Sequence, residues 1–261
     1  MAKVNELPPV PEQPVLPPEV AIRDEEPLAI ESDDGVALEG RIAIPSGARR
    51  VVVIAHPHPL YGGTMHNAVV VALAKVLVER GAAVVRFDFR GVGRSAGRHD
   101  GGQLEIGDVV GALRAASRAL PGAPVTAVGY SFGSWVTHRA VLRRAAGVDV
   151  ERVALIAPAA RLFDFVRGVD RASPGEASAF AGPKAIVLGD HDEFCDVDEA
   201  MVIARHLEAS LCVVRGADHF FLSGRRRVAE LLAPFALGEV DTLPAEAAPP
   251  AAGRAPSGGP A

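Results

Sequence analysis

The chain is poor in the features that mark secreted, membrane-bound and nucleic-acid-binding proteins. Its 261 residues include only two cysteines, Cys195 and Cys212, whose spacing fits neither a metal site nor a redox pair, so we expect two ordinary thiols. No apolar run reaches the length of a transmembrane helix. The 27 basic and 32 acidic residues give a formal net charge of −5, which predicts neither nucleic acid nor an anionic membrane as a partner. A cytoplasmic protein is therefore expected, because the N-terminus also lacks the basic and apolar pattern of a signal peptide.

Both ends of the chain lack apolar periodicity. Residues 1–25 contain many prolines and several acids, which is typical of an extended, disordered arm. Residues 240–261 are mostly alanine, proline and glycine and predict a disordered tail. Hydrophobic residues make up 49% of the chain, enough for a sizeable core, so one folded domain is expected over residues 26–239.

Between these ends, apolar runs and helical patterns follow one another. Asp34-Gly35 separates two apolar runs and indicates a hairpin over residues 27–44. Later runs suit strands buried on both faces of a parallel sheet; they are Val51–His56, Ala82–Phe87, Val125–Tyr130, Val153–Ala157, Ala185–Gly189 and Leu211–Arg215. Helical patterns cover residues 67–79, 104–120, 132–145, 197–207 and 228–237. This order predicts an α/β fold, with a mostly parallel central sheet, an N-terminal antiparallel hairpin and helices on both faces.

The segment between residues 158 and 183 is less regular. Residues 162–166 are apolar and are interpreted as a short helix, which Ser173-Pro174-Gly175 would end. A small lid or substrate wall is one interpretation of this segment. An ordinary crossover is favoured, because the segment is short. No large cap domain is therefore expected.

One strand run ends in a motif typical of a catalytic serine. Val125–Tyr130 leads into Gly129-Tyr130-Ser131-Phe132-Gly133, and a helical pattern follows. This G-x-S-x-G pattern predicts a nucleophile elbow, a sharp turn from strand to helix that exposes the serine hydroxyl. Glycines suit the turn because the strand and the helix pass too closely for a Cβ. The alternative is that Ser131 only caps the helix.

A nucleophilic serine needs an imidazole base, and the imidazole needs a carboxylate that holds its tautomer. Two later strand ends supply candidates in the required order, acid first and histidine second. Asp190 and Asp192 follow the run at 185–189, and His219 follows the run at 211–215. Strand ends of a parallel sheet converge at one edge, so Ser131, His219 and one of the two acids are expected to meet there.

Together, residues 129–133, 189–192 and 216–219 resemble the α/β-hydrolase superfamily. Residues 56–67 read His-Pro-His-Pro-Leu-Tyr-Gly-Gly-Thr-Met-His-Asn, and residues 87–95 read Phe-Asp-Phe-Arg-Gly-Val-Gly-Arg-Ser. Both stretches are similar to a cytoplasmic bacterial group of compact serine hydrolases without a large cap, related to dienelactone-hydrolase-like and Xaa-Pro-peptidase-like esterases. The resemblance covers roughly residues 27–235. It implies the α/β-hydrolase fold and a serine esterase that needs no cofactor.

The resemblance also selects the acid of the catalytic triad. The superfamily's usual Gly-x-x-Asp pattern at this strand end falls on Asp192. Asp190, which is closer to the strand, remains the alternative.

An oxyanion hole requires two hydrogen-bond donors. The N–H of Phe132, directly after the nucleophile, is expected to be the first. The second should come from the loop after residue 55, where many relatives carry His-Gly. This chain has Pro57 there, which has no N–H, so the backbone N–H of His58 is expected to donate, with Leu60 and Tyr61 as alternatives.

The same loop supplies other candidates. Tyr61 and Gly62 are expected to line the acyl pocket. His56, His58 and His66 lack carboxylate or cysteine companions with metal spacing, so no metal is expected. Residues 91–96 match a dinucleotide fingerprint, but no helix opens directly after them, so no dinucleotide is expected.

The predicted function is hydrolysis of small carboxylic esters or related acyl compounds by Ser131, His219 and Asp192 through an acyl-enzyme. Peptidase and acyltransferase reactions use the same residue types. A catalytically silent binding or interaction module of the same fold is the alternative. The expected partner is a small-molecule substrate, and the sequence indicates no oligomeric state.

Overall fold

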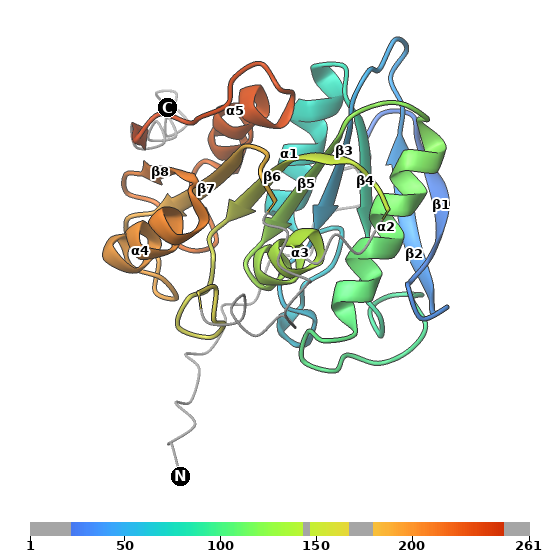
Figure 1. The fold of residues 1–261 in the computed structure, drawn as a ribbon, viewed down its shortest axis with the longest axis horizontal. Coiled ribbons are helices and arrows are strands. Elements are labelled where there is room, and N and C mark those ends of the chain that lie inside the picture. The colour runs from blue at the N-terminus through green and yellow to red at the C-terminus, as the bar shows by residue number, and fades with distance from the viewer. Residues whose placement is uncertain (1–21, 143–146, 167–179, 248–261) are drawn as a thin grey trace, which may run out of the picture.

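A computed structural model describes residues 22–142, 147–166 and 180–247 (Figure 1). The described chain forms one nine-stranded sheet with the order β1-β2-β4-β3-β5-β6-β7-β8-β9. The strands are β1 (Glu25–Glu31), β2 (Ala37–Ala43), β3 (Val51–Ala55), β4 (Ala83–Phe87), β5 (Val125–Tyr130), β6 (Val150–Ile156), β7 (Lys184–Gly189), β8 (Ser210–Val214) and β9 (Glu246–Ala247). β2 pairs antiparallel with β1 and β4, whereas every other pair is parallel. The predicted α/β-hydrolase fold with an N-terminal antiparallel hairpin is confirmed.

Helices cover both faces of the sheet (Figure 1). They are α1 (Ala68–Glu79), α2 (Glu105–Ala119), α3 (Phe132–Leu142), α4 (Val197–Leu207) and α5 (Arg225–Ala236). Alternate residues of each buried strand face opposite sides, so Val51 and Val53 belong to the core that includes residues of α2, α3 and α4, while Val52 and Ile54 belong to the core that includes residues of α1 and α5. Two hydrophobic cores result, one on each face of the sheet. No helix in the described ranges is long and apolar enough to cross a membrane.

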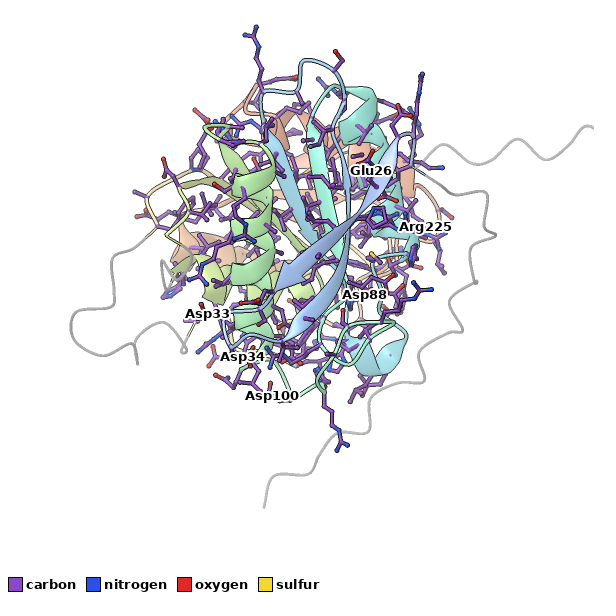
Figure 2. The ribbon with its side chains drawn as sticks, turned by 90° about the vertical axis from the view of Figure 1, so that its right-hand side faces the viewer. Glu26, Asp33, Asp34, Asp88, Asp100 and Arg225 are labelled. Carbon is purple, nitrogen blue, oxygen red and sulfur yellow. The ribbon has the colours of Figure 1, made fainter. Side chains whose placement is uncertain are left out.

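The hairpin is tied to the rest of the domain through Arg90, which follows β4. Its guanidinium donates to the carboxylates of Asp34 in the hairpin turn and Asp108 in α2. It also donates to the hydroxyl of Ser32 at 2.9 Å. Figure 2 looks onto this side of the molecule, where Asp33 and Asp34 lie at the hairpin turn. The loops that follow β4 are thereby anchored beneath the hairpin.

The ordered region extends past the boundary expected at residue 239. Leu243 is buried, and its N–H donates to Ser210 Oγ at 3.1 Å. Val213 N–H donates to Ala245 O at 2.9 Å, and β9 pairs with β8. Composition alone missed this segment, because its order comes from hydrogen bonds at the open edge of β8. The arm expected over residues 1–25 is likewise wrong at its end, because Ile22 is buried and β1 begins at Glu25. Residues 1–21 and 248–261 lie outside the described residues.

The prediction of a short helix over residues 162–166 is also wrong. These residues form turns instead. The carboxylate of Asp164 accepts the N–H of Val166 at 2.9 Å, a local bond that competes with a helix. The carbonyl of Asp164 accepts the indole N–H of Trp135 at 3.0 Å, which fixes this turn against α3. The predicted break at residues 173–175, and the end of the predicted helix at 143–145, lie outside the described residues.

Candidate active site

Ser131 lies at the turn between β5 and α3, with a φ of 56° in the left-handed region that few non-glycine residues adopt. Its N–H donates to Ile156 O on the neighbouring strand at 2.9 Å, and its carbonyl accepts the N–H of Ser134 at 3.0 Å. A Cβ on Gly129 would lie 2.2 Å from Gly133 O, and a Cβ on Gly133 would lie 2.5 Å from Ala55 O. Both glycines are therefore required by close backbone contacts, and the surrounding bonds hold the strained serine in place.

Three predicted side chains form a hydrogen-bonded chain at the carboxyl edge of the sheet. His219 Nε2 lies 2.9 Å from Ser131 Oγ, and His219 Nδ1 lies 2.8 Å from Asp192 Oδ2. The other oxygen of Asp192 accepts the N–H of Phe194 at 2.8 Å. Ser131, Asp192 and His219 are 8%, 6% and 4% exposed, so only a small part of the serine is open to solvent. This arrangement suits proton transfer from the serine hydroxyl to the imidazole.

Asp190, the alternative acid, does not lie against His219. Its Oδ1 accepts the N–H of Gly216 at 2.6 Å, which ties the loop after β7 to the loop after β8. Asp218, the sequence neighbour of His219, accepts the N–H of Leu222 at 3.1 Å. The structure therefore brings Asp192, and not Asp190 or Asp218, to the imidazole.

The loop after β3 contains a short 3-10 helix over Pro59–Tyr61. The N–H of Leu60 donates to His58 Nδ1 at 3.2 Å, and the N–H of Tyr61 donates to His58 O at 3.1 Å. Both alternative oxyanion donors are thus engaged inside the turn. Within the described part of the chain, no hydrogen bond uses the N–H of His58. Phe132 is the first residue of α3, where N–H groups have no partner within the helix.

Comparisons with known proteins agree with this geometry. A family model described as serine aminopeptidase, S33 (Hydrolase_4), matches residues 46–173. A Rickettsia prowazekii protein of uncharacterized function is 32% identical over 193 aligned positions, and the match covers 70% of this chain and 77% of the relative. An α/β serine hydrolase homologue from Coxiella burnetii is 32% identical with a TM-score of 0.68, and the match covers 80% of this chain and 95% of the homologue. The chain belongs to the α/β-hydrolase superfamily.

A further solved relative bears on the architecture of this α/β-hydrolase. It is an α/β serine hydrolase without a lid from Xanthomonas campestris, 28% identical with a TM-score of 0.66, covering 85% of this chain and 98% of the relative.

The pocket beside Ser131 has a wall of rings and aliphatic side chains. It is lined by Pro57, His58, Tyr61, Tyr130, Ser131, Leu162, Phe163, Phe194, His219 and Phe220, with a cavity volume of about 40 Å³. None of these described lining residues is an acid, a lysine or an arginine. Tyr61 lines the pocket as expected, whereas Gly62 lies at the exposed end of the 3-10 helix with a φ of 75° and is not part of the wall. The pocket of this α/β-hydrolase therefore suits a small uncharged group.

Burial keeps the two histidines of the loop after β3 neutral. It lowers the pKa of His56 to about 3 and that of His58 to about 4, with His99 near His58 adding to the effect. Both nitrogens of His56 have protein partners, Pro57 O and the N–H of Phe89. His56 therefore has no free lone pair for a metal, and the described residues hold no cluster of three potential metal ligands.

Neither cysteine of this α/β-hydrolase has the environment of a nucleophile. Burial raises the pKa of Cys195 to about 12 and that of Cys212 to about 11, so both remain thiols near neutral pH. Both side chains lie in the hydrophobic cores.

Sequence reasoning missed several residues of the site. The hydroxyl of Tyr130 donates to His219 O at 3.0 Å and so supports the loop that carries the imidazole. The rings of Phe194 and Phe220 lie 4.6 Å and 5.3 Å from that of His219. Their places in the sequence could have identified these residues, because each lies next to or near a member of the predicted triad. Tyr130 directly precedes Ser131, Phe194 follows Asp192 by two positions, and Phe220 directly follows His219.

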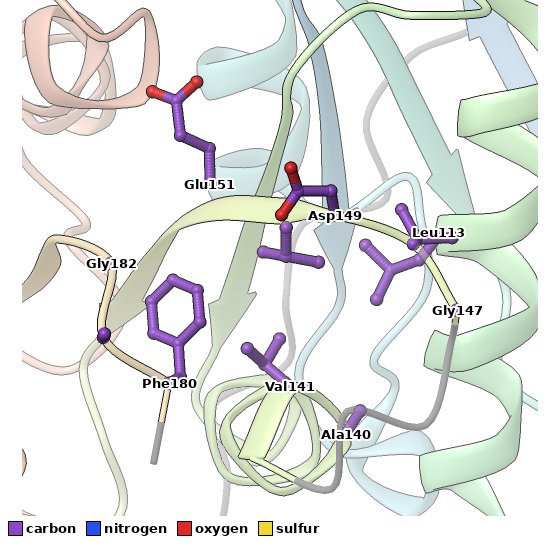
Figure 3. A pocket seen from close by; sticks show the side chains of 11 residues that line it. Leu113, Ala140, Val141, Gly147, Asp149, Glu151, Phe180 and Gly182 are labelled. Carbon is purple, nitrogen blue, oxygen red and sulfur yellow. The ribbon is translucent and has the colours of Figure 1, made fainter. Parts of the chain in front are cut away.

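A second hollow, of about 620 Å³, lies at the opposite ends of the same elements (Figure 3). It is lined by the C-terminal end of α3 and the start of β6, and it includes Leu113, Val141 and Phe180. Two carboxylates, Asp149 and Glu151, line it, and Glu151 is paired with Arg50 at 3.0 Å. No serine, cysteine or histidine is among its described lining residues, so it has no counterpart of the Ser131–His219 pair.

Proposed function

We propose that this α/β-hydrolase is a serine hydrolase of small carboxylic esters or related acyl compounds and that it acts through an acyl-enzyme on Ser131. The observation that carries the proposal is the chain of hydrogen bonds from Asp192 through His219 to Ser131, at 2.8 Å and 2.9 Å, beside an apolar pocket. A strained serine turn and a buried acid–imidazole pair have no use in a binding module, which makes that alternative weaker.

Acylation begins when Ser131 Oγ attacks the carbonyl carbon of the ester. The hydroxyl proton passes to His219 Nε2, and the carbonyl π electrons move to oxygen, which becomes an oxyanion. The N–H groups of Phe132 and His58 donate to that oxyanion. The intermediate then collapses, the bond to the leaving oxygen breaks, and that oxygen takes the proton from Nε2 and departs as an alcohol.

Deacylation repeats these steps with water as the nucleophile. His219 takes a proton from the water that attacks the acyl carbon, and it returns this proton to Ser131 Oγ when the acyl–serine bond breaks. The acyl group departs as a carboxylic acid. Throughout, Asp192 accepts the Nδ1–H and stabilises the imidazolium that forms in each half-reaction.

The pocket supports a short, uncharged acyl group. Rings of Tyr61, Phe163 and Phe220 line it, and its cavity volume is about 40 Å³. A charged acyl group would lose hydration there without gaining an ion-pair partner. The family model is described as a serine aminopeptidase, which makes a peptide with a free amino terminus a second candidate substrate. Such a substrate carries an ammonium group, for which the described lining residues offer no carboxylate.

A fluorophosphonate probe tests the proposal, together with hydrolysis of p-nitrophenyl butyrate. The wild type should be labelled and active, and Ser131→Ala should be neither. Ser46→Ala, at an exposed turn between β2 and β3, serves as the control and should behave as the wild type. Absent labelling of the wild type, or equal labelling of Ser131→Ala, would refute the proposed function. A binding module of the same fold would then be the remaining interpretation.

A further inference from the structure

His56, the residue directly after β3, is completely buried and is held in one tautomer. The N–H of Phe89 donates to its Nε2 at 3.0 Å, so Nε2 must carry a lone pair. The carboxylate of Asp88 lies 3.8 Å from Nε2, too far for a hydrogen bond. The single proton of the neutral ring is therefore on Nδ1, which lies 2.6 Å from Pro57 O and donates to it.

Gly63 packs against the same Pro57 carbonyl. A Cβ at this position would lie 2.1 Å from Pro57 O and 2.7 Å from His58 O. Gly63 does not have a positive φ, so its backbone alone would accept an alanine. Glycine is required here because the Pro57 carbonyl packs directly against its Cα. The Gly63 N–H also donates to His58 O at 3.0 Å, which closes the loop around this peptide.

These contacts fix the direction of the His58 N–H. The described chain has no cis peptide bond, so the carbonyl of Pro57 and the N–H of His58 lie on opposite sides of one planar peptide. With the carbonyl held by His56 and packed on Gly63, the N–H faces away from both. Pro57, His58 and Ser131 line the same pocket.

We propose that His56 is a positioning residue for the oxyanion hole: its Nδ1–H holds the Pro57 carbonyl and thereby turns the His58 N–H toward the substrate's carbonyl oxygen at Ser131. The inference rests on the proposed function, because it gives the second donor of the same site its orientation. Without this bond the peptide is free to rotate. A rotated peptide would replace the donor by a carbonyl oxygen, which repels the developing oxyanion.

The matched substitutions are His56→Asn and His56→Leu, which have side chains of the same shape. Both leave the Phe89 N–H without its acceptor, so their folding penalties should be similar. Only Asn keeps a donor at the position of Nδ1. We expect His56→Leu to lower kcat about 10²-fold, the order of one lost oxyanion donor, with KM nearly unchanged. His56→Asn should stay within several-fold of the wild type.

Inhibition by an alkylboronic acid gives a second readout, since its tetrahedral adduct with Ser131 places an oxygen in the oxyanion hole. His56→Leu should weaken this inhibition by the same factor by which it lowers kcat, and His56→Asn should not. Equal kcat values and equal boronate affinities for the two variants would overturn the proposal. Thermal unfolding of each variant checks that both are folded.

If neither His56 variant folds, Gly63→Ala tests whether the position of the Pro57 carbonyl controls the oxyanion hole. Its Cβ would displace the Pro57 carbonyl, so kcat and boronate affinity should fall together. Gly47→Ala is the control for a general loss of stability, because Gly47 has a φ of 77° that strains an alanine, its Cβ would meet nothing within 4 Å, and it lies in the turn between β2 and β3, so stability should fall while kcat stays at the wild-type value. Wild-type values for Gly63→Ala would then overturn the proposal. If the wild type is labelled at Ser131 while these variants are unaffected, only the positioning role fails. An unlabelled wild type refutes the proposed function and this inference together.

Discussion

Replacing Asp192 with asparagine should reverse the tautomer of His219. The two oxygens of Asp192 accept the N–H of Phe194 and the Nδ1–H of His219, each at 2.8 Å. An asparagine has one oxygen, and the Phe194 N–H can be paired only with that oxygen. Its NH₂ group would then face Nδ1, which would have to accept, and the ring proton would move to Nε2.

A proton on Nε2 points at Ser131 Oγ, 2.9 Å away, and removes the base that the serine needs. The loss expected for a wrong tautomer in such a triad is about 10⁴-fold in kcat. At about 1.36 kcal/mol for each factor of ten, this corresponds to about 5.5 kcal/mol of transition-state stabilisation. KM should change little, because Asp192 does not line the pocket. Steady-state hydrolysis of p-nitrophenyl butyrate measures both constants.

Asp190→Asn is the matched control for this prediction. Asp190 uses one oxygen to accept the N–H of Gly216, and asparagine keeps an oxygen for that bond. The variant should therefore retain kcat within several-fold. The reasoning is refuted if Asp192→Asn stays within tenfold of the wild type, or if Asp190→Asn shows the larger loss.

Three further predictions concern stability and specificity. Arg90→Met should lower the free energy of unfolding, measured in urea, by about 3–5 kcal/mol, because it removes the cation that neutralises the buried Asp108 carboxylate. Arg226→Met, which breaks only exposed ion pairs, should leave the midpoint nearly unchanged. Burial lowers the pKa of His138 to about 4 from 6.5, so the unfolded state binds the extra proton and stability falls as the pH drops from about 6.5 toward 4. His138→Leu should reduce that loss between pH 7.5 and pH 5 in urea unfolding, and an unchanged slope would contradict this. Finally, p-nitrophenyl butyrate should exceed the corresponding hemisuccinate in kcat/KM by at least about tenfold, because the pocket offers an anion no partner; equal values would contradict the apolar pocket as the source of specificity.

Much of the fold and the core of the site were predictable because they depend on local patterns. The elbow at Ser131 needs a strand, two glycines and a helix in sequence, and all four are visible in the chain. His219 follows the parallel strand β8 at the edge where parallel strands converge. The hairpin, the parallel strands and the helices follow from periodicity for the same reason.

Other features depend on how the loops fold, which periodicity does not encode. Asp190 and Asp192 both follow β7, and the bond from Gly216 to Asp190 separates their environments. The turn at residues 162–166 depends on the side chain of Asp164, although the composition of this segment suits a helix. The tautomer of His56 is set by the N–H of Phe89, which lies 33 positions away in the sequence.

The two-residue strand β9 has a consequence that concerns solubility and not catalysis. A chain shortened at residue 239 would keep the elbow, the acid and the imidazole, but would lose the partner of Val213 and the buried Leu243. The outer side of β8, which reads Ser-Leu-Cys-Val-Val, would then present open backbone donors and acceptors to other molecules. Such a shortened protein would be prone to self-association through the exposed edge of β8, although the Ser131, Asp192 and His219 arrangement would be unchanged.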